Sequence, residues 1–398
     1  MRENKEKTFI LPVIVLFVLY LLFTVADLST SAQSGYRGAD RSGAHRYLLM
    51  VTGFLIVYLP FNVRDLKIRQ PVSSLIVLLV WTVYVNFINN VSIWGLLVQG
   101  NMSFLWVLSY IFFETARSRE EKDKSLVRKM IFILAAFYAV ATIYYFFDIM
   151  MRKGSIPVLN VVYYGMALLP WLFISSSKKT KAVITVIALV VVVFSMKRGA
   201  IIALPLMILA NYFIQGKIEN SNKNMLKLFA VIILFFVAVM IANNLTGGFL
   251  TDRFSGEEIE SGSGRSEQIG LITRLLGEKD FVDLFIGSGC EKSIQILGTG
   301  IHNEWLNFLY CYGIIGFIIY AVLIIGFIRK SFYVLRTTPE LAPACFMMTA
   351  LYLVLSMVST GYGGYVGFWL FGFWGYVNAE IEHRTKKSGE ETQYEIVQ

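Results

Sequence analysis

The chain has 398 residues, of which 56% are hydrophobic and only 16% are charged, and its mean hydropathy is +0.61. Ordinary soluble domains are about 45–50% apolar and about 25% charged, so this composition excludes a disordered chain, a secreted disulfide scaffold and a typical cytosolic enzyme. So much apolar surface needs lipid as its solvent. We therefore expect an all-α, polytopic integral membrane protein.

The formal net charge of +9 is spread along the chain. A nucleic-acid-binding protein gathers lysine and arginine on one soluble face, whereas here these residues separate apolar runs, so we expect no nucleic-acid partner. The three cysteines, Cys290, Cys311 and Cys345, are odd in number and imply no disulfide framework. The first apolar run resembles a signal peptide, but the many runs that follow favour a retained first helix.

A membrane-spanning helix needs about 20 mostly apolar residues, or somewhat fewer when flanking side chains reach the interface. The segments that meet this requirement are residues 9–25, 47–61, 72–88, 93–115, 130–149, 161–176, 182–196, 199–215, 228–246, 304–328, 343–360 and 362–379. They predict about 12 transmembrane helices. The segment 93–115 is the least regular, because Gly100 and Asn101 interrupt it, and a broken or re-entrant helix is an alternative there.

The lysines and arginines predict the orientation, because they accumulate in short cytoplasmic segments. With both termini in the cytoplasm, the inner segments hold 24 of the 36 and the outer segments hold 12. We therefore expect transmembrane helices within residues 1–246 and 304–379, a large outer loop at 247–303 and a cytoplasmic tail at 380–398. A loop of 57 residues is a favoured place for function.

Familiar catalytic motifs are absent from the sequence, which contains no GxxxxGK[ST] phosphate loop, HExxH, CxxC, GxSxG or Asp-x-Asp motif. The three histidines, His45, His302 and His383, fall in separate segments. We therefore expect no metal site, no cofactor and no ATP-driven pump.

Two adjacent cations, Lys197 and Arg198, separate apolar runs of about 15 residues each, and runs so short and so close predict a helical hairpin at the membrane edge. One interpretation is that both side chains only reach water and cap the hairpin. The alternative is that Arg198 binds an anionic head group, since guanidinium pairs bidentately with phosphate oxygens.

Within the long loop, Gly262 and Gly264 free the backbone ahead of Arg265 and a predicted helix at 266–276. Amides at a helix start favour anions, and Arg265 would add a full charge there. A solvated linker is the alternative. Nearby, Arg253 has Asp252 as a neighbour for a surface ion pair of little energetic value.

His302 stands where the long loop re-enters the membrane. A single histidine is most often a surface or capping residue. At the lipid edge, however, an imidazole that titrates near neutrality is suited to take a proton from a hydroxyl nucleophile.

Taken together, these segments resemble the O-antigen polymerase and O-antigen ligase superfamily, bacterial membrane glycosyltransferases with a large periplasmic loop. The resemblance covers residues 195–316 and departs at Ile269, where the family often has tryptophan. The motifs that carry it are Arg198-Gly199-Ala200, Ser263-Gly264-Arg265, Phe285-Ile286-Gly287-Ser288-Gly289, and His302-Asn303 followed by Leu306 and Gly313.

The resemblance implies transfer of a glycan from undecaprenyl diphosphate to a sugar hydroxyl, with inversion, at the periplasmic face of the bacterial inner membrane. Arg198 and Arg265 would stabilise the diphosphate, and His302 would deprotonate or orient the acceptor. The substrate-binding residues would be Lys197, Arg253, Asn303 and Glu304. The expected partners are an undecaprenyl-diphosphate-linked oligosaccharide and membrane lipid. A protein that regulates chain length is a further candidate partner.

Three functions stay open. A polymerase would use another lipid-linked repeat unit as acceptor, and a ligase would use lipid A-core; we favour the polymerase because such enzymes vary more in sequence. A secondary transporter would also suit twelve spans. Against it, no acidic residue other than Asp148 is a candidate for a mid-span position, and no repeat of broken helices is evident.

Overall fold

The computed structural model describes residues 2–34, 42–62, 71–117, 121–220, 223–254, 265–298, 300–359, 362 and 365–397, and every regular element in these ranges is helical. The all-α prediction is therefore confirmed. The elements are α1 (Arg2–Ser34), α2 (Ser42–Asn62), α3 (Val72–Ile88), α4 (Ile93–Arg117), α5 (Glu121–Lys153), α6 (Val162–Ser175), α7 (Lys178–Phe194), α8 (Arg198–Glu219), α9 (Lys223–Leu245), α10 (Phe249–Arg253), α12 (Arg265–Gly277), α13 (Phe281–Ile286), α14 (Cys290–Leu297), α15 (Glu304–Thr337), a short 3₁₀ turn (Pro339–Leu341), α16 (Ala342–Val358) and α17 (Gly367–Val397).

A helix covers most of each range that was predicted to cross the membrane; several helices extend further at their ends, and α17 begins only at Gly367. The alternative of a break near Gly100 is wrong, because α4 is continuous from Ile93 to Arg117. The interruption lies instead in α15 at Gly313, where φ is 68°. The segment predicted as a tail continues α17 as one helix to Val397.

Seven of the described helices are long and apolar enough to cross a membrane, namely α1, α2, α4, α5, α8, α15 and α16, and shorter apolar stretches lie in α3, α6 and α9. The outward-facing surface is apolar as well. In α9, for example, Phe236 and Met240 are 61% and 66% exposed. Exposed apolar side chains in such rows need lipid around them, in agreement with an all-α membrane protein.

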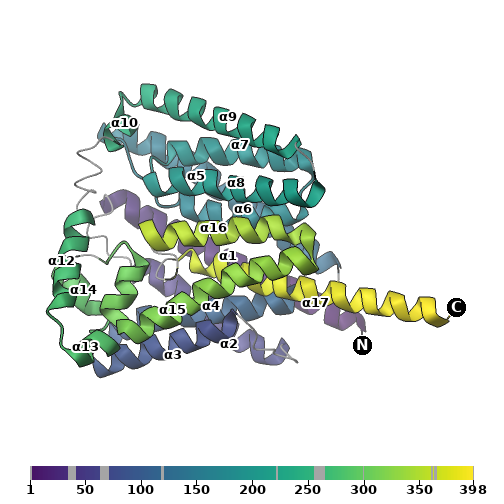
Figure 1. Ribbon diagram of the computed structural model, residues 1–398, viewed down its shortest axis with the longest axis horizontal. Coiled ribbons are helices and arrows are strands. Elements are labelled where there is room, and N and C mark those ends of the chain that lie inside the picture. The colour runs from purple at the N-terminus through teal and green to yellow at the C-terminus, as the bar shows by residue number, and fades with distance from the viewer. Residues whose placement is uncertain are drawn as a thin grey trace.

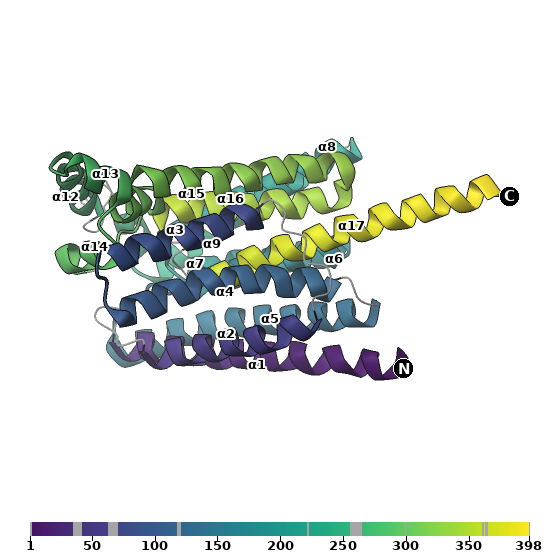
Figure 2. The same cartoon turned by 90° about the horizontal axis from the view of Figure 1, so that it is seen from below.

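The helices pack side by side along one direction (Figures 1 and 2), and the loop helices α10, α12, α13 and α14 gather at one end. We call this end the loop end. Both chain termini lie at the opposite end, the terminal end, where α17 projects beyond the bundle. An even number of crossings gives this arrangement.

Close helix packing at the centre depends on glycine. A Cβ atom at Gly367 would overlap the Trp106 ring, and one at Gly375 would overlap the backbone of Tyr110, so α17 and α4 touch along these positions. Trp106 also donates a hydrogen bond of 2.8 Å from its Nε1 to the backbone oxygen of Tyr362. Small residues that let helix backbones approach replace the hydrophobic effect as the source of packing energy in lipid.

Candidate active site

The predicted hairpin between α7 and α8 is present, and it makes a tight cationic turn. Met196 adopts a φ of 52°, Lys197 is the N-cap of α8, and Arg198 is its first helical residue. Leu159 donates its backbone N–H to the Ser195 oxygen at 2.9 Å, which anchors the turn to the segment before α6. Both cations are half-buried at the positive end of the α8 dipole, so the turn favours an anion.

The residue after Arg198 is a glycine, Gly199, because its neighbours leave no room for a side chain. A Cβ atom there would overlap the Tyr163 hydroxyl of α6 and would lie 2.9 Å from Cγ2 of Val358, the last residue of α16. The Lys197 ammonium stands 5.8 Å from the centroid of the Tyr163 ring, in a cation–π contact. The glycine therefore permits α8 to begin directly against α6 and α16.

The start of α15 contains the predicted His302-Asn303 pair. Asn303 is the N-cap of α15, and its Oδ1 accepts a hydrogen bond of 3.0 Å from the Leu306 N–H. Its Nδ2 donates to the backbone oxygen of Met357, at 3.3 Å. His302 is exposed beside it. An N-cap asparagine thus fixes the backbone that presents the imidazole.

These two segments meet at the last turn of α16. Gly199 packs on Val358, and Asn303 bonds to Met357, the adjacent residue. On the same turn, Trp305 donates from Nε1 to Oγ of Ser356 at 3.1 Å. Two of the three predicted motifs, far apart in the sequence, therefore lie around one helix end.

Glu304 does not face the open space around His302. Its side chain is only 1% exposed, and its Oε2 accepts a hydrogen bond of 2.6 Å from the hydroxyl of Tyr320, which lies beyond the Gly313 interruption of α15. A buried carboxylate of this kind holds the start of α15 in place. This position does not offer Glu304 to a substrate.

The third motif is described in part. Arg265 is the first residue of α12, which confirms the predicted helix at 266–276, and α12 packs against α15 at the loop end (Figure 1). Ser263 and Gly264 lie outside the described residues, as do the side chains of Arg253 and Arg265.

The glycine-rich stretch after α13 docks on the interruption in α15. Gly289 donates its N–H to the Cys311 oxygen at 2.9 Å, with φ of 78°. A Cβ atom at Gly287 would overlap the Cys311 backbone, and one at Gly313 would overlap the backbone of Phe285. These glycines allow two backbones to touch, and a structural role explains them fully.

An apolar groove runs between α5, α6 and α7. Small side chains hollow it out, among them Ala135, Ala139, Gly165 and Ala188. Its lining continues to Val162, the residue before Tyr163, and to Val192, three residues before Ser195. The groove therefore ends beside the cationic turn, a combination suited to a lipid chain with an anionic head.

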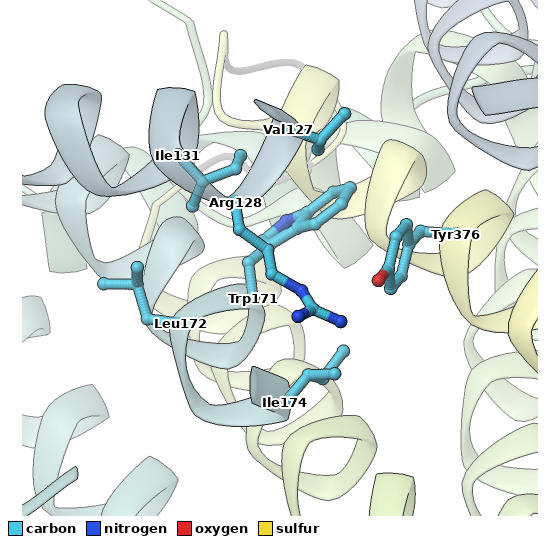
Figure 3. Close-up of a pocket in the computed structure, with 7 residues that line it drawn as sticks. All are labelled: Val127, Arg128, Ile131, Trp171, Leu172, Ile174 and Tyr376. Carbon is cyan, nitrogen blue, oxygen red and sulfur yellow. The ribbon is translucent and has the colours of Figure 1, made fainter. Parts of the chain in front are cut away.

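A second, smaller hollow is far from the site. Figure 3 shows Arg128 of α5 reaching between Ile174 and Tyr376, over Trp171. Arg128 lies near the start of α5, Trp171 and Ile174 lie near the end of α6, and Tyr376 belongs to α17, so this hollow lies toward the terminal end.

The sequence analysis missed a buried carboxylate in α1. Asp27 is 7% exposed, and its Oδ2 accepts a hydrogen bond of 3.1 Å from the Tyr164 hydroxyl in α6. The predicted first span ends at residue 25, whereas α1 continues to Ser34 and so includes Asp27. One turn earlier, Thr24 and Tyr138 share a hydroxyl hydrogen bond of 3.0 Å.

The predicted Asp148 has a simpler setting, since it pairs with Arg152 at 2.7 Å, one turn along α5. His45 lies in the first turn of α2, where its Nε2 is 3.1 Å from the Tyr365 hydroxyl.

Compared with known proteins, the chain matches no protein-family model, and no curated protein matches it significantly.

Proposed function

We propose that this protein is a polymerase of O-antigen-type surface polysaccharide, which transfers an undecaprenyl-diphosphate-linked glycan to a sugar hydroxyl of another lipid-linked repeat unit. The observation that carries the proposal is the meeting of Lys197–Gly199 and His302–Asn303 around the last turn of α16. An anion-binding group and a base at one end of a membrane bundle suit a lipid diphosphate donor and a hydroxyl acceptor.

In the proposed reaction the acceptor oxygen attacks the anomeric carbon from the side opposite the diphosphate. The bond to the diphosphate oxygen breaks, the anomeric configuration inverts, and His302 takes the hydroxyl proton. Arg198, assisted by Lys197 and by the α8 dipole, stabilises the charge on the departing diphosphate. Arg265 is assigned the same task from α12.

The apolar groove between α5, α6 and α7 supports this donor. Its end beside the Lys197–Arg198 turn would let a prenyl chain lie along the groove while the diphosphate contacts the cations. A bulky Ala139→Trp variant should then weaken donor binding, whereas Val183→Trp, on an exposed face of α7, is the matched control.

In the proposed topology, twelve helices cross the bacterial inner membrane, both termini are cytoplasmic, and residues 247–303 face the periplasm. The opposite placement of the termini and the loop helices in Figure 2 supports it.

The ligase is the alternative within the same chemistry, and the lipopolysaccharide of a deletion strain distinguishes the two. Loss of a polymerase leaves lipid A-core with a single repeat unit, whereas loss of a ligase leaves it without any. A deletion strain with full-length polymer would contradict both.

One observation favours a transporter, namely Asp27, because a buried carboxylate among transmembrane helices often marks a transport pathway. Substrate-dependent uptake into sealed vesicles that is lost in Asp27→Asn would establish that function instead.

A further inference from the structure

Two of the three cysteines lie on facing elements at the loop end. Cys290 is the first residue of α14, and Cys311 belongs to the second turn of α15, 0% exposed. The peptide N–H of Gly289, the residue before Cys290, donates to the Cys311 oxygen at 2.9 Å. The two chain segments are therefore in direct backbone contact at these residues.

The thiol of Cys311 points at the first turn of α14. Its Sγ lies 3.5 Å from Oγ of Ser293, and that hydroxyl in turn donates to the backbone oxygen of Cys290 at 3.1 Å. Cys290 is held from the other side, where its N–H donates to Oδ1 of Asn86 at 2.9 Å. The Ser293 hydroxyl thus bridges the Cys311 sulfur and the Cys290 backbone oxygen.

The third cysteine has a different place. Cys345 is in the first turn of α16, which begins at Ala342, at the terminal end of the bundle, and it is fully buried. Cys290 and Cys311 are thus the two cysteines that lie together at the loop end and whose chain segments are in contact. Disulfides form where that end faces an oxidising compartment.

We infer that Cys290 and Cys311, which are free thiols in this structure, are joined by a disulfide in the membrane-inserted protein, which ties α14 to α15 beside the Gly313 interruption. The two thiols lose two protons and two electrons to an oxidant that itself carries a disulfide and leaves as a dithiol. One of the two thiolates attacks the oxidant and forms a mixed disulfide, and the other then displaces the oxidant, which leaves as its dithiol.

The bond would form before the loop helices are fully packed. Once they are packed, burial raises the pKa of the Cys290 thiol to about 12, so almost no thiolate is present at neutral pH. High-pKa thiols are also poor leaving groups, so a bond already formed there resists reduction. These properties fit a structural disulfide and not a redox switch.

The test counts free thiols in protein from cells that are quenched in acid, denatured and treated with a polyethylene-glycol maleimide. Without reductant, we expect one addition, at Cys345, and three additions after reduction. Cys290→Ser should give two additions with or without reductant, and Cys345→Ser should give none without reductant. Three additions to never-reduced wild-type protein would overturn the inference.

A loop end that faces the cytoplasm would also leave both thiols reduced. To separate that case, Lys292→Cys is placed in a cysteine-free variant and labelled with an impermeant maleimide on intact spheroplasts; Lys292 is exposed in α14. Labelling together with a reduced native pair would overturn the disulfide alone. An unlabelled Cys at this position, with labelling only after lysis, would overturn the disulfide and also the proposed periplasmic site.

Discussion

Asn303 donates a hydrogen bond from its side-chain amide to the backbone oxygen of Met357, 54 residues further along the chain. With its other side-chain atom it caps α15. One side chain therefore fixes both the direction in which α15 starts and its position on the end of α16. These two hydrogen bonds therefore also determine the position of the adjacent residue, His302.

Replacing Asn303 with alanine should lower the stability of the protein and its activity together. Loss of an N-cap costs about 1 kcal/mol, and the contact with Met357 is lost in addition. Asn244→Ala, an exposed asparagine at the end of α9, is the control. The measurements are thermal unfolding in bicelles and polymer length on gels. An unchanged midpoint and unchanged polymer would contradict the role given to Asn303.

Arg198→Ala should reduce the rate of polymer formation by about a hundredfold to a thousandfold, because one electrostatic group that stabilises a leaving charge contributes about this much. Arg198→Lys should recover part of the rate, since it keeps the charge but not the bidentate geometry. Arg152→Ala is the control, because Arg152 is a largely exposed arginine in the last turn of α5. Near-normal polymer from Arg198→Ala, with normal protein in the membrane, would exclude the anion-site role.

His302→Gln should remove the rise of activity with pH near neutrality. An imidazole acts as a base only when it is neutral, so wild-type activity should increase as the pH rises through its titration. His383→Gln, an exposed histidine of α17 toward the terminal end, should keep the wild-type profile. The readout is the initial rate between about pH 5 and pH 9, which covers the range in which histidine titrates. The same profile in wild type and His302→Gln would rule out the base.

Gly199→Ala should disturb the site through packing alone, since its Cβ would overlap the Tyr163 hydroxyl. Overpacking of this kind costs about 1–3 kcal/mol. Tyr163→Phe removes the hydroxyl, so the double variant should recover part of the lost stability. Gly270→Ala in α12, where nothing lies within 4 Å, is the control and should be neutral or slightly stabilising. A Gly199→Ala protein as stable and active as wild type would refute the close approach.

Asp27→Ala should destabilise the protein by about 1–3 kcal/mol, because the buried Tyr164 hydroxyl loses its acceptor. The cost should be smaller in a Tyr164→Phe background, and a double-mutant cycle measures the difference. Asp148→Ala removes a surface ion pair and should cost less than about 1 kcal/mol. Additive effects of the Asp27 and Tyr164 changes would mean that their hydrogen bond contributes nothing.

The helical architecture could be predicted because each helix carries its own signal, a long apolar run bounded by lysine, arginine or turn residues. The interruption of α15 at Gly313 could not be predicted in this way. Gly100 lies inside α4 with only an ordinary contact to Val83, so the helix tolerates it. Gly313 breaks α15 because the segment around Phe285 docks there, and hydropathy does not record contacts between distant segments.

The site was predictable in the same limited way. Lys197, Arg198 and His302 stand at the edges of apolar runs, and this position indicates a functional role for them. That Gly199 and Asn303 meet at the end of α16 depends on three-dimensional packing. Asp27 was missed because it follows the apolar core of α1, where a hydropathy boundary is softest.

The central claim is that this protein elongates a lipid-linked glycan, and reconstitution of the purified protein tests it most directly. The protein in liposomes is incubated with an undecaprenyl-diphosphate-linked repeat unit alone, and the products are resolved by size. We predict a ladder of polymers that disappears with Arg198→Ala and persists with Arg152→Ala. Absence of a ladder with the authentic repeat unit, followed by single transfer once lipid A-core is added, would contradict the polymerase and establish the ligase.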